Sequence, residues 1–141
     1  MTKILLAADG SKYTKKALGF LVTHEGLCRP DDTLLVVNVQ PAVPARVKTM
    51  VGTAAVNDYH ADEARKVLAP IERFLKSHKL QFRTSWVVGS PAPELLAVAK
   101  KEKAQLIVMG THGHGLIGRA LMGSVAQRVV SEGDVPVLLV K

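Results

Sequence analysis

Short apolar segments alternate along this chain with longer segments in which apolar residues recur at helical spacing. The apolar segments are rich in Leu, Ile and Val, which is typical of strands that are buried on both faces of a sheet. We therefore expect five strands, over residues 3–8, 33–39, 81–88, 106–109 and 136–140.

The segments between these strands predict helices over residues 11–24, 57–78, 90–102 and 125–130. Ser11 can cap the first of them, and Pro93 can occupy the first turn of the third. Pro70 removes a backbone donor inside the long helix, which predicts a kink or a split near Val67. Residues 40–56 are expected to form a loop, either a plain connector or a lid.

Strands that alternate with helices form a parallel sheet with helices on both faces. Right-handed crossovers then favour one α/β domain over residues 1–141, a doubly wound five-stranded sheet of order 3-2-1-4-5. Ligands of such sheets bind where the strand order reverses, beyond the carboxyl ends of the first and fourth strands. Asp9 and Gly110 directly follow those two ends, which places the expected crevice beside them.

A glycine-rich loop follows the fourth predicted strand and leads into the last predicted helix. Backbone N–H groups at a helix N-terminus are a ready site for phosphate, and glycine lets that backbone come close. Residues 113–118 match the dinucleotide fingerprint Gly-x-Gly-x-x-Gly, but a single strand follows and no acidic residue ends it. Lys12 lacks the frame of a P-loop, and Asp9 lacks the acidic neighbours of a receiver domain.

The spacing of the whole loop is more specific than that fingerprint. Gly110-Thr111-His112-Gly113, nine residues and then Gly123-Ser124 resemble the ATP-binding members of the universal stress protein family. Residues 4–11, 88–91, 106–113 and 135–140 are similar to other segments of the family, so the resemblance covers the whole chain. It implies an ATP, ADP or AMP ligand, with Mg²⁺ carried by the phosphates.

The loop residues are assigned to the phosphate side of this site. Gly110 and Gly113 are expected to permit positive φ and to leave room for ribose or phosphate. Gly123 brings the loop against the phosphates, and Ser124 can donate its hydroxyl. The N–H groups of Ser124 and Val125 open the last helix toward the ligand. Taken alone, Gly123-Ser124 is also consistent with a simple helix start.

The first two strands are assigned to the nucleoside side. Asp9 can accept hydrogen bonds from ribose or adenine-side groups, although capping the first helix is an alternative role. The resemblance implies that the main chain of Val39 contacts the adenine edge. Ala7 and Ala8 would form a small flat floor, and Met109 is counted among the binding residues at the end of the fourth strand.

The histidines raise the question of a metal. His112 and His114 lie two apart in the loop with no third ligand nearby in sequence, while His60 and His78 belong to another helix. A dedicated zinc site needs three or four converging ligands, so we expect no metal site. A contact from His114 or Arg119 to phosphate is the better interpretation.

Composition limits the remaining possibilities. The net charge is +7, but the basic residues are scattered and aromatic residues make up 4%, so we expect no nucleic-acid partner. No apolar run is long enough for a membrane span. The lone Cys28 cannot form an internal disulfide, which favours a buried thiol and a cytoplasmic location.

No arrangement of residues indicates catalysis, so we expect a regulatory adenine-nucleotide-binding protein of the universal stress response and not an enzyme. A slow ATPase or phosphotransferase that uses the same pocket is the alternative, and a scaffold with an empty site is a third possibility. The final strand lies at a sheet edge and is strongly apolar, so it needs cover. The resemblance implies a homodimer formed through it.

Overall fold

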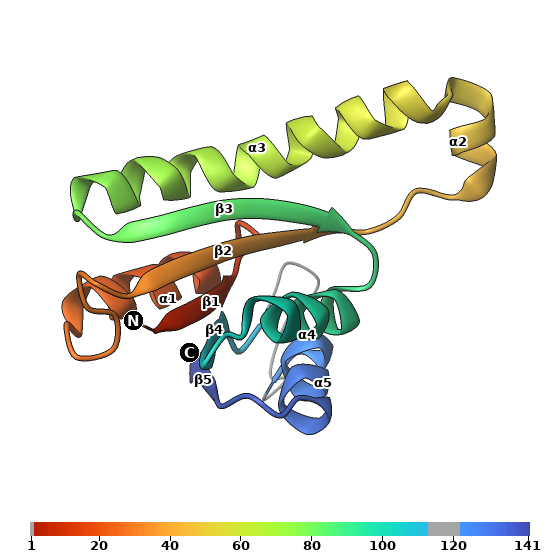
Figure 1. The fold of residues 1–141 in the computed structure, drawn as a ribbon. Coiled ribbons are helices and arrows are strands. Elements are labelled where there is room, and N and C mark those ends of the chain that lie inside the picture. The colour runs from red at the N-terminus through yellow and green to blue at the C-terminus, as the bar shows by residue number, and fades with distance from the viewer. Residues whose placement is uncertain (1, 113–121) are drawn as a thin grey trace.

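A five-stranded parallel sheet with helices on both faces forms the centre of the molecule (Figure 1). The computed structural model describes residues 2–112 and 122–141. The strand order is β3-β2-β1-β4-β5, which confirms the predicted order. The strands are β1 (Lys3–Ala7), β2 (Thr33–Gln40), β3 (Gln81–Val88), β4 (Leu106–Gly110) and β5 (Val137–Val140). The helices are α1 (Lys12–Thr23), α2 (Ala45–Val51), α3 (Thr53–Ser77), α4 (Pro91–Glu102) and α5 (Ser124–Glu132).

Two apolar cores cover the two faces of the sheet. On one face Leu6 and Val36 pack with residues of α1 and α3, and on the other Leu5 and Ile107 pack with residues of α4 and α5. Successive residues of a strand point to opposite faces, so one short strand such as β1 contributes to both cores. The three inner strands are therefore mostly apolar, as the sequence indicated, although Asn38 and Gln40 near the end of β2 are buried polar residues.

The two edge strands differ from that expectation. Along β3, exposed and half-buried residues are interspersed, and every residue of β5 is half-buried. An edge strand has a neighbour on one side, and its faces extend beyond the helices that cover the sheet. The apolar sequence of β5 is thus left partly uncovered in a single chain.

Residues 40–56 are not a plain loop, because they contain α2 and the start of α3. α2 lies at the outer end of α3, away from the sheet (Figure 1), and none of its residues is buried. A helix without a buried face has no amphipathic pattern, so the sequence did not reveal it. The two helices are joined at Gly52, whose φ of 89° is one that glycine adopts readily.

The split predicted near Val67 is wrong, because α3 continues through Pro70 without interruption. Ala64, Leu68 and Ile71 precede and follow the expected break, and all three are buried in the core under the sheet. Their continuous packing outweighs the hydrogen bond that proline removes.

The structure gives no helix that could cross a bilayer within residues 2–112 and 122–141. Cys28, which the sequence predicted to be buried, is 3% exposed. Its burial, together with the nearby Asp32 carboxylate, raises the pKa of the thiol. A raised pKa lowers the thiolate fraction, which makes this cysteine unreactive.

Asp32 fastens the loop before β2 to the start of the chain. Its carboxylate accepts the backbone N–H of Thr2 at 3.0 Å and that of Arg29 at 2.9 Å, and the residue is 3% exposed. The N–H of Arg29 lowers the pKa of Asp32 most, burial acts in the opposite direction, and the N–H of Thr2 and the Arg29 charge lower it further. The ionised carboxylate therefore stabilises the folded state.

We predict that Asp32→Asn lowers the free energy of unfolding by about 1–3 kcal/mol at neutral pH, because the amide keeps one acceptor oxygen and loses the charge. A carboxyl whose pKa is lowered on folding contributes stability above its unfolded pKa and loses it as pH falls through the folded value. The difference between wild type and variant should therefore shrink in acid, below the usual carboxyl range. Urea unfolding across pH measures it, with the exposed Asp31→Asn as control.

Candidate functional site

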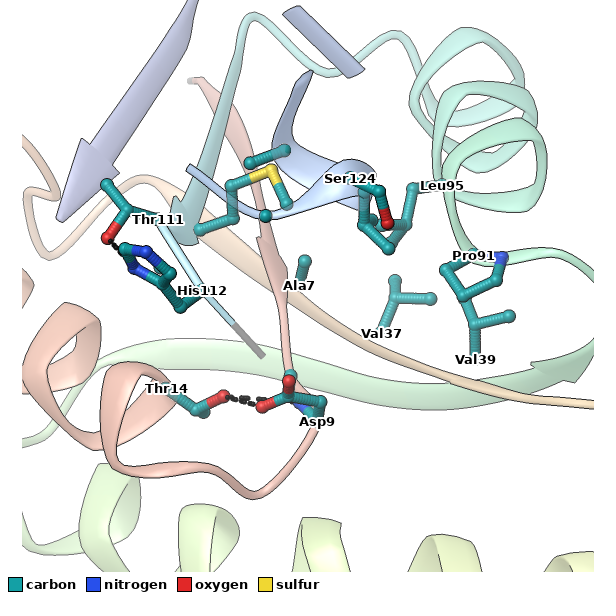
Figure 2. Close-up of a pocket in the computed structure, with 16 residues that line it drawn as sticks. Ala7, Asp9, Thr14, Val37, Val39, Pro91, Leu95, Thr111, His112 and Ser124 are labelled. Atoms are coloured by element: carbon teal, nitrogen blue, oxygen red, sulfur yellow. Dashed lines mark hydrogen bonds between the residues drawn. The ribbon is translucent and has the colours of Figure 1, made fainter. Parts of the chain in front are cut away.

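A cavity of about 440 Å³ opens beyond the carboxyl ends of β1, β2 and β4, at the point where the strand order reverses. α4 and α5 line it from one face of the sheet, and the start of α1 lines it at the rim (Figure 2). Every predicted site residue that the structure describes lies in its wall. These residues are Ala7, Ala8, Asp9, Val39, Met109, Gly110, Gly123, Ser124 and Val125. Gly113, His114 and Arg119 lie outside the described residues.

The floor of the cavity is apolar. Ala7, Val37 and Val39 belong to the face of the sheet that packs against α4 and α5, and Leu95 of α4 lies beside them. Val37 and Leu95 were not predicted as site residues, although alternation along β2 places Val37 on the same face as Val39. Such a floor fits the flat face of an apolar ring.

Hydrogen bonds to the start of α1 hold Asp9 at the rim. Its Oδ1 accepts the backbone N–H of Ser11 at 2.9 Å. The same oxygen accepts the hydroxyl of Thr14 at 2.8 Å, and the Asp9 N–H donates to Thr14 Oγ1 at 3.2 Å (Figure 2). Asp9 therefore orders the turn before α1, but Ser11 occupies the N-cap position, so the alternative role of Asp9 as the helix cap is not confirmed. These bonds fix its orientation, and its carboxylate still lines the cavity.

The capping hydrogen bond predicted for the Ser11 side chain is not formed, and a different hydroxyl, that of Thr14, contributes to the rim. Ser11 occupies the N-cap position of α1, but its side chain makes no capping hydrogen bond, and its Oγ has no partner within the described part of the chain. Thr14, which the sequence did not single out, lines the cavity and secures Asp9. The sequence signal that could have identified Thr14 is a hydroxyl on the buried face of α1, about one turn beyond Asp9.

The start of α5 forms the polar wall of the cavity. Gly123 is its N-cap residue, and Ser124 and Val125 are its first two residues. The Gly123 N–H donates to the Thr111 carbonyl at 2.7 Å, which holds this helix start against the end of β4. The first turn of α5 contains no acidic residue, so the helix supplies no carboxylate of its own to offset the positive end of its dipole.

The expectation that Gly110 needs a positive φ is wrong. Among the described glycines, positive φ is found at Gly10, Gly52 and Gly89. A Cβ added at Gly110 would collide with the Cβ of Tyr13 and lie 3.3 Å from its backbone carbonyl carbon. Glycine is required there because α1 packs directly on the end of β4. Gly123 likewise has an ordinary φ of −70°. Glycine at this position therefore serves to let a ligand come close to the backbone, and not to permit an unusual backbone conformation.

His112 lies at the opposite rim from α4. Its Nδ1 is 2.8 Å from the Thr111 hydroxyl, and its ring is tilted against that of Tyr13 with centroids 5.0 Å apart. Both Thr111 and His112 line the cavity, although neither was predicted as a binding residue. Within the described residues, no group of three or more His, Cys, Asp or Glu side chains is placed to hold a metal ion.

The arrangement combines features that suit a nucleotide. A flat apolar floor, an oriented carboxylate and an uncompensated helix N-terminus share one cavity. These groups match, in order, a planar base, a sugar with hydroxyl donors and an anionic phosphate. None of them is an obvious acid, base or nucleophile directed at a second group.

Known proteins share both the sequence and the fold. The family model described as "Universal stress protein family" matches residues 1–141. A universal stress protein of Thermus aquaticus is 36% identical over 98% of this chain and 97% of its own length. A solved structure of a Methanocaldococcus jannaschii protein, itself named a universal stress protein, superposes with a TM-score of 0.84. It is 25% identical, over 99% of this chain and 95% of that one.

A further solved structure contains a ligand. It is a universal stress protein from Archaeoglobus fulgidus in complex with dAMP, with a TM-score of 0.73 and 22% identity. The match covers 100% of this chain and 98% of that one. At this identity the likeness concerns the fold.

We predict that Gly110→Ala destabilises the protein by about 1–3 kcal/mol, because the new methyl group forces α1 away from β4. Gly19→Ala makes the same chemical change inside α1, where a Cβ meets nothing within 4 Å. It should stabilise the protein by up to about 1 kcal/mol, because alanine favours the helix. Thermal unfolding of both variants measures the two effects, and equal shifts of the same sign would contradict the packing argument.

Proposed function

Since this chain belongs to the universal stress protein family, we propose that its cavity binds an adenine nucleotide and that binding serves a regulatory role in the stress response. The observation that carries the proposal is the meeting of the α5 N-terminus and the apolar floor in one cavity at the switch point of the sheet. Open α/β sheets bind ligands at this place.

Each wall of the cavity has a role in this proposal. The base lies on Ala7, Val37 and Val39, and the ribose approaches Asp9. The phosphates meet the N–H groups of Ser124 and Val125, where an anion is favoured by the helix dipole. The dAMP complex of the Archaeoglobus fulgidus relative supports an adenine nucleotide as the ligand class.

We take ATP as the first candidate ligand, with AMP and ADP as alternatives. The cavity volume of about 440 Å³ lies within the range of small-ligand pockets, and the phosphates are proposed to extend from the base toward Ser124. A Mg²⁺ ion, if it accompanies ATP, is carried by the phosphates, because such ions keep several waters and need few protein ligands.

The proposed role is binding without turnover. Phosphoryl transfer needs a group that orients water or a second nucleophile and a cation on the transferring phosphate. Asp9, the carboxylate in the cavity wall, is bonded to Ser11 and Thr14 at the start of α1. This favours a ligand-binding regulator over the alternative of a slow ATPase or phosphotransferase.

Self-association through β5 is part of the proposal. The strand is apolar, half-buried and placed at the edge of the sheet. A second copy would cover its outward backbone groups and the exposed parts of its side chains, which a lone edge strand leaves to water.

We predict that wild-type protein binds ATP, ADP or AMP in calorimetric titrations and that Gly123→Val weakens the affinity by about tenfold or more. The φ of −70° at Gly123 is compatible with valine, and the new side chain obstructs the phosphate wall. Gly26→Val is the matched control, because a Cβ at Gly26 meets nothing within 4 Å.

Equal affinity in wild type and in a folded Gly123→Val protein would refute the proposed site. Absence of any nucleotide binding by the wild type would favour a scaffold role. The nucleotide recovered after titration is identified by mass: intact ATP fits the regulator, and stoichiometric ADP fits the slow ATPase.

We also predict a solution mass of twice one chain at micromolar concentration, measured by sedimentation equilibrium. A charged residue at the edge should weaken this association, so Leu139→Lys is expected to shift the mass toward that of one chain. A monomeric wild type would contradict the proposed dimer and would leave the nucleotide proposal untouched.

A further inference from the structure

Asn38 is a buried polar residue on the face of the sheet opposite the cavity. It is 3% exposed and alternates along β2 with Val37 and Val39, which line the cavity. Its side-chain Nδ2 donates to the carbonyl of Ala8 at 2.8 Å. Burying a side-chain amide costs free energy unless it is hydrogen-bonded. An amide buried and bonded at this position therefore indicates a structural or functional role.

That hydrogen bond lies where β1 leaves β2. The pairing of the two strands ends at Ala7 and Val37, and the last backbone bond between them runs from the Ala8 N–H to the Val37 carbonyl at 2.9 Å. Were the ladder to continue, the Ala8 carbonyl would accept the N–H of Val39. The side chain of Asn38 occupies that carbonyl instead, and the chain turns away through Gly10 into α1.

The direction of the backbone N–H and C=O groups of β2 determines which of them are left open when the Asn38 side chain replaces a ladder hydrogen bond. The carbonyl of Val37 points toward β1, and that of Gln40 points toward β3, where it accepts the Gly89 N–H at 2.9 Å. Backbone groups alternate in direction along a strand, so the N–H and C=O of Val39 point to the β1 side, like those of Val37. There β1 has already turned away, and Val39 lines the cavity.

A second buried amide fixes Asn38. Gln40, which is 8% exposed, donates its Nε2 to Asn38 Oδ1 at 2.6 Å. Because a carbonyl can only accept, these two bonds define which end of the Asn38 amide faces Ala8. The chain of bonds therefore runs from Gln40 through Asn38 to the Ala8 carbonyl, which belongs to the cavity wall.

We propose that Asn38 is a positioning residue that determines base specificity: by taking the Ala8 carbonyl, it leaves the backbone N–H of Val39 open to the base, beside the Val39 C=O that the turn of the chain at Gly10 leaves open. The inference rests on the proposed nucleotide function. Adenine presents an amino donor beside a ring-nitrogen acceptor, which matches one backbone C=O and N–H. Hypoxanthine, with an oxygen acceptor in place of the amino group, does not match that pair.

The test compares wild type with Asn38→Leu, which removes the donor at similar volume. In calorimetric titrations, the variant should bind AMP about tenfold more weakly, and its preference for AMP over IMP should fall toward one. Ribose 5-phosphate, which lacks the base, should bind both proteins equally. A purely structural role would weaken all three ligands together or none of them.

Thr84→Val is the matched control. It also removes a side-chain hydrogen bond, here between two half-buried residues, from the Thr84 hydroxyl to Glu72 at 2.7 Å. It should leave the preference for AMP over IMP unchanged. Gln40→Leu keeps the Asn38 amide but removes the group that orients it, so it should show a smaller loss of preference. If Asn38→Leu folds poorly, Gln40→Leu serves as the test variant in its place.

Amide hydrogen exchange, measured by NMR on nucleotide-free protein, tests the geometry without a ligand. The Val39 amide should exchange faster than ladder amides of β2 in wild type. It should become protected in Asn38→Leu, where the Ala8 carbonyl takes the next backbone N–H. Unchanged exchange, or an unchanged base preference in a folded variant, would overturn the role of Asn38. A wild type that binds no AMP but shows the expected exchange would overturn the proposed function alone.

Discussion

The parting of β1 from its neighbours at Ala7 is the constraint on which the site depends. β1 lies between β2 and β4, and its chain must leave the sheet to begin α1 on one face, while β4 leads to α5 on the other. Two adjacent strands that send their chains to opposite faces open a gap at their carboxyl ends. The cavity, the rim carboxylate of Asp9 and the start of α5 are all arranged around that gap.

A gap between two strands leaves backbone groups without their ladder partners and removes packing contacts. The surrounding residues compensate with hydrogen bonds of their own. On one face, Asn38 and Gln40 supply the hydrogen bonds that the ladder no longer makes. At the rim, Asp9 and Thr14 bind the first turn of α1. The other face of the sheet stays apolar and open to the cavity. The hydrogen-bonding side chains and the floor of the cavity therefore lie on opposite faces of the same strands.

The strand order and the place of the site were predictable from sequence because they depend on periodicity and on crossover handedness. α2 was not, since it buries no residue and leaves no pattern. The roles of Thr14 and Asn38 were hidden for another reason: each bonds a partner whose position depends on the tertiary turn at Ala8 and Asp9. The periodicity of apolar residues predicts where strands and helices lie, whereas the hydrogen-bond partners of a side chain in another element are known only from the three-dimensional structure.

Gly110 illustrates how a correct residue can be predicted for an incorrect reason. The spacing of glycines identified it as a site residue, on the expectation of positive φ, and it does line the cavity. Its φ is ordinary, and the neighbour that excludes a side chain is Tyr13 of α1. Tyr13 also contacts His112 across the rim. The glycine therefore acts on the cavity through packing: it brings α1, and with it Asp9 and Thr14, close enough to β4 to form one wall.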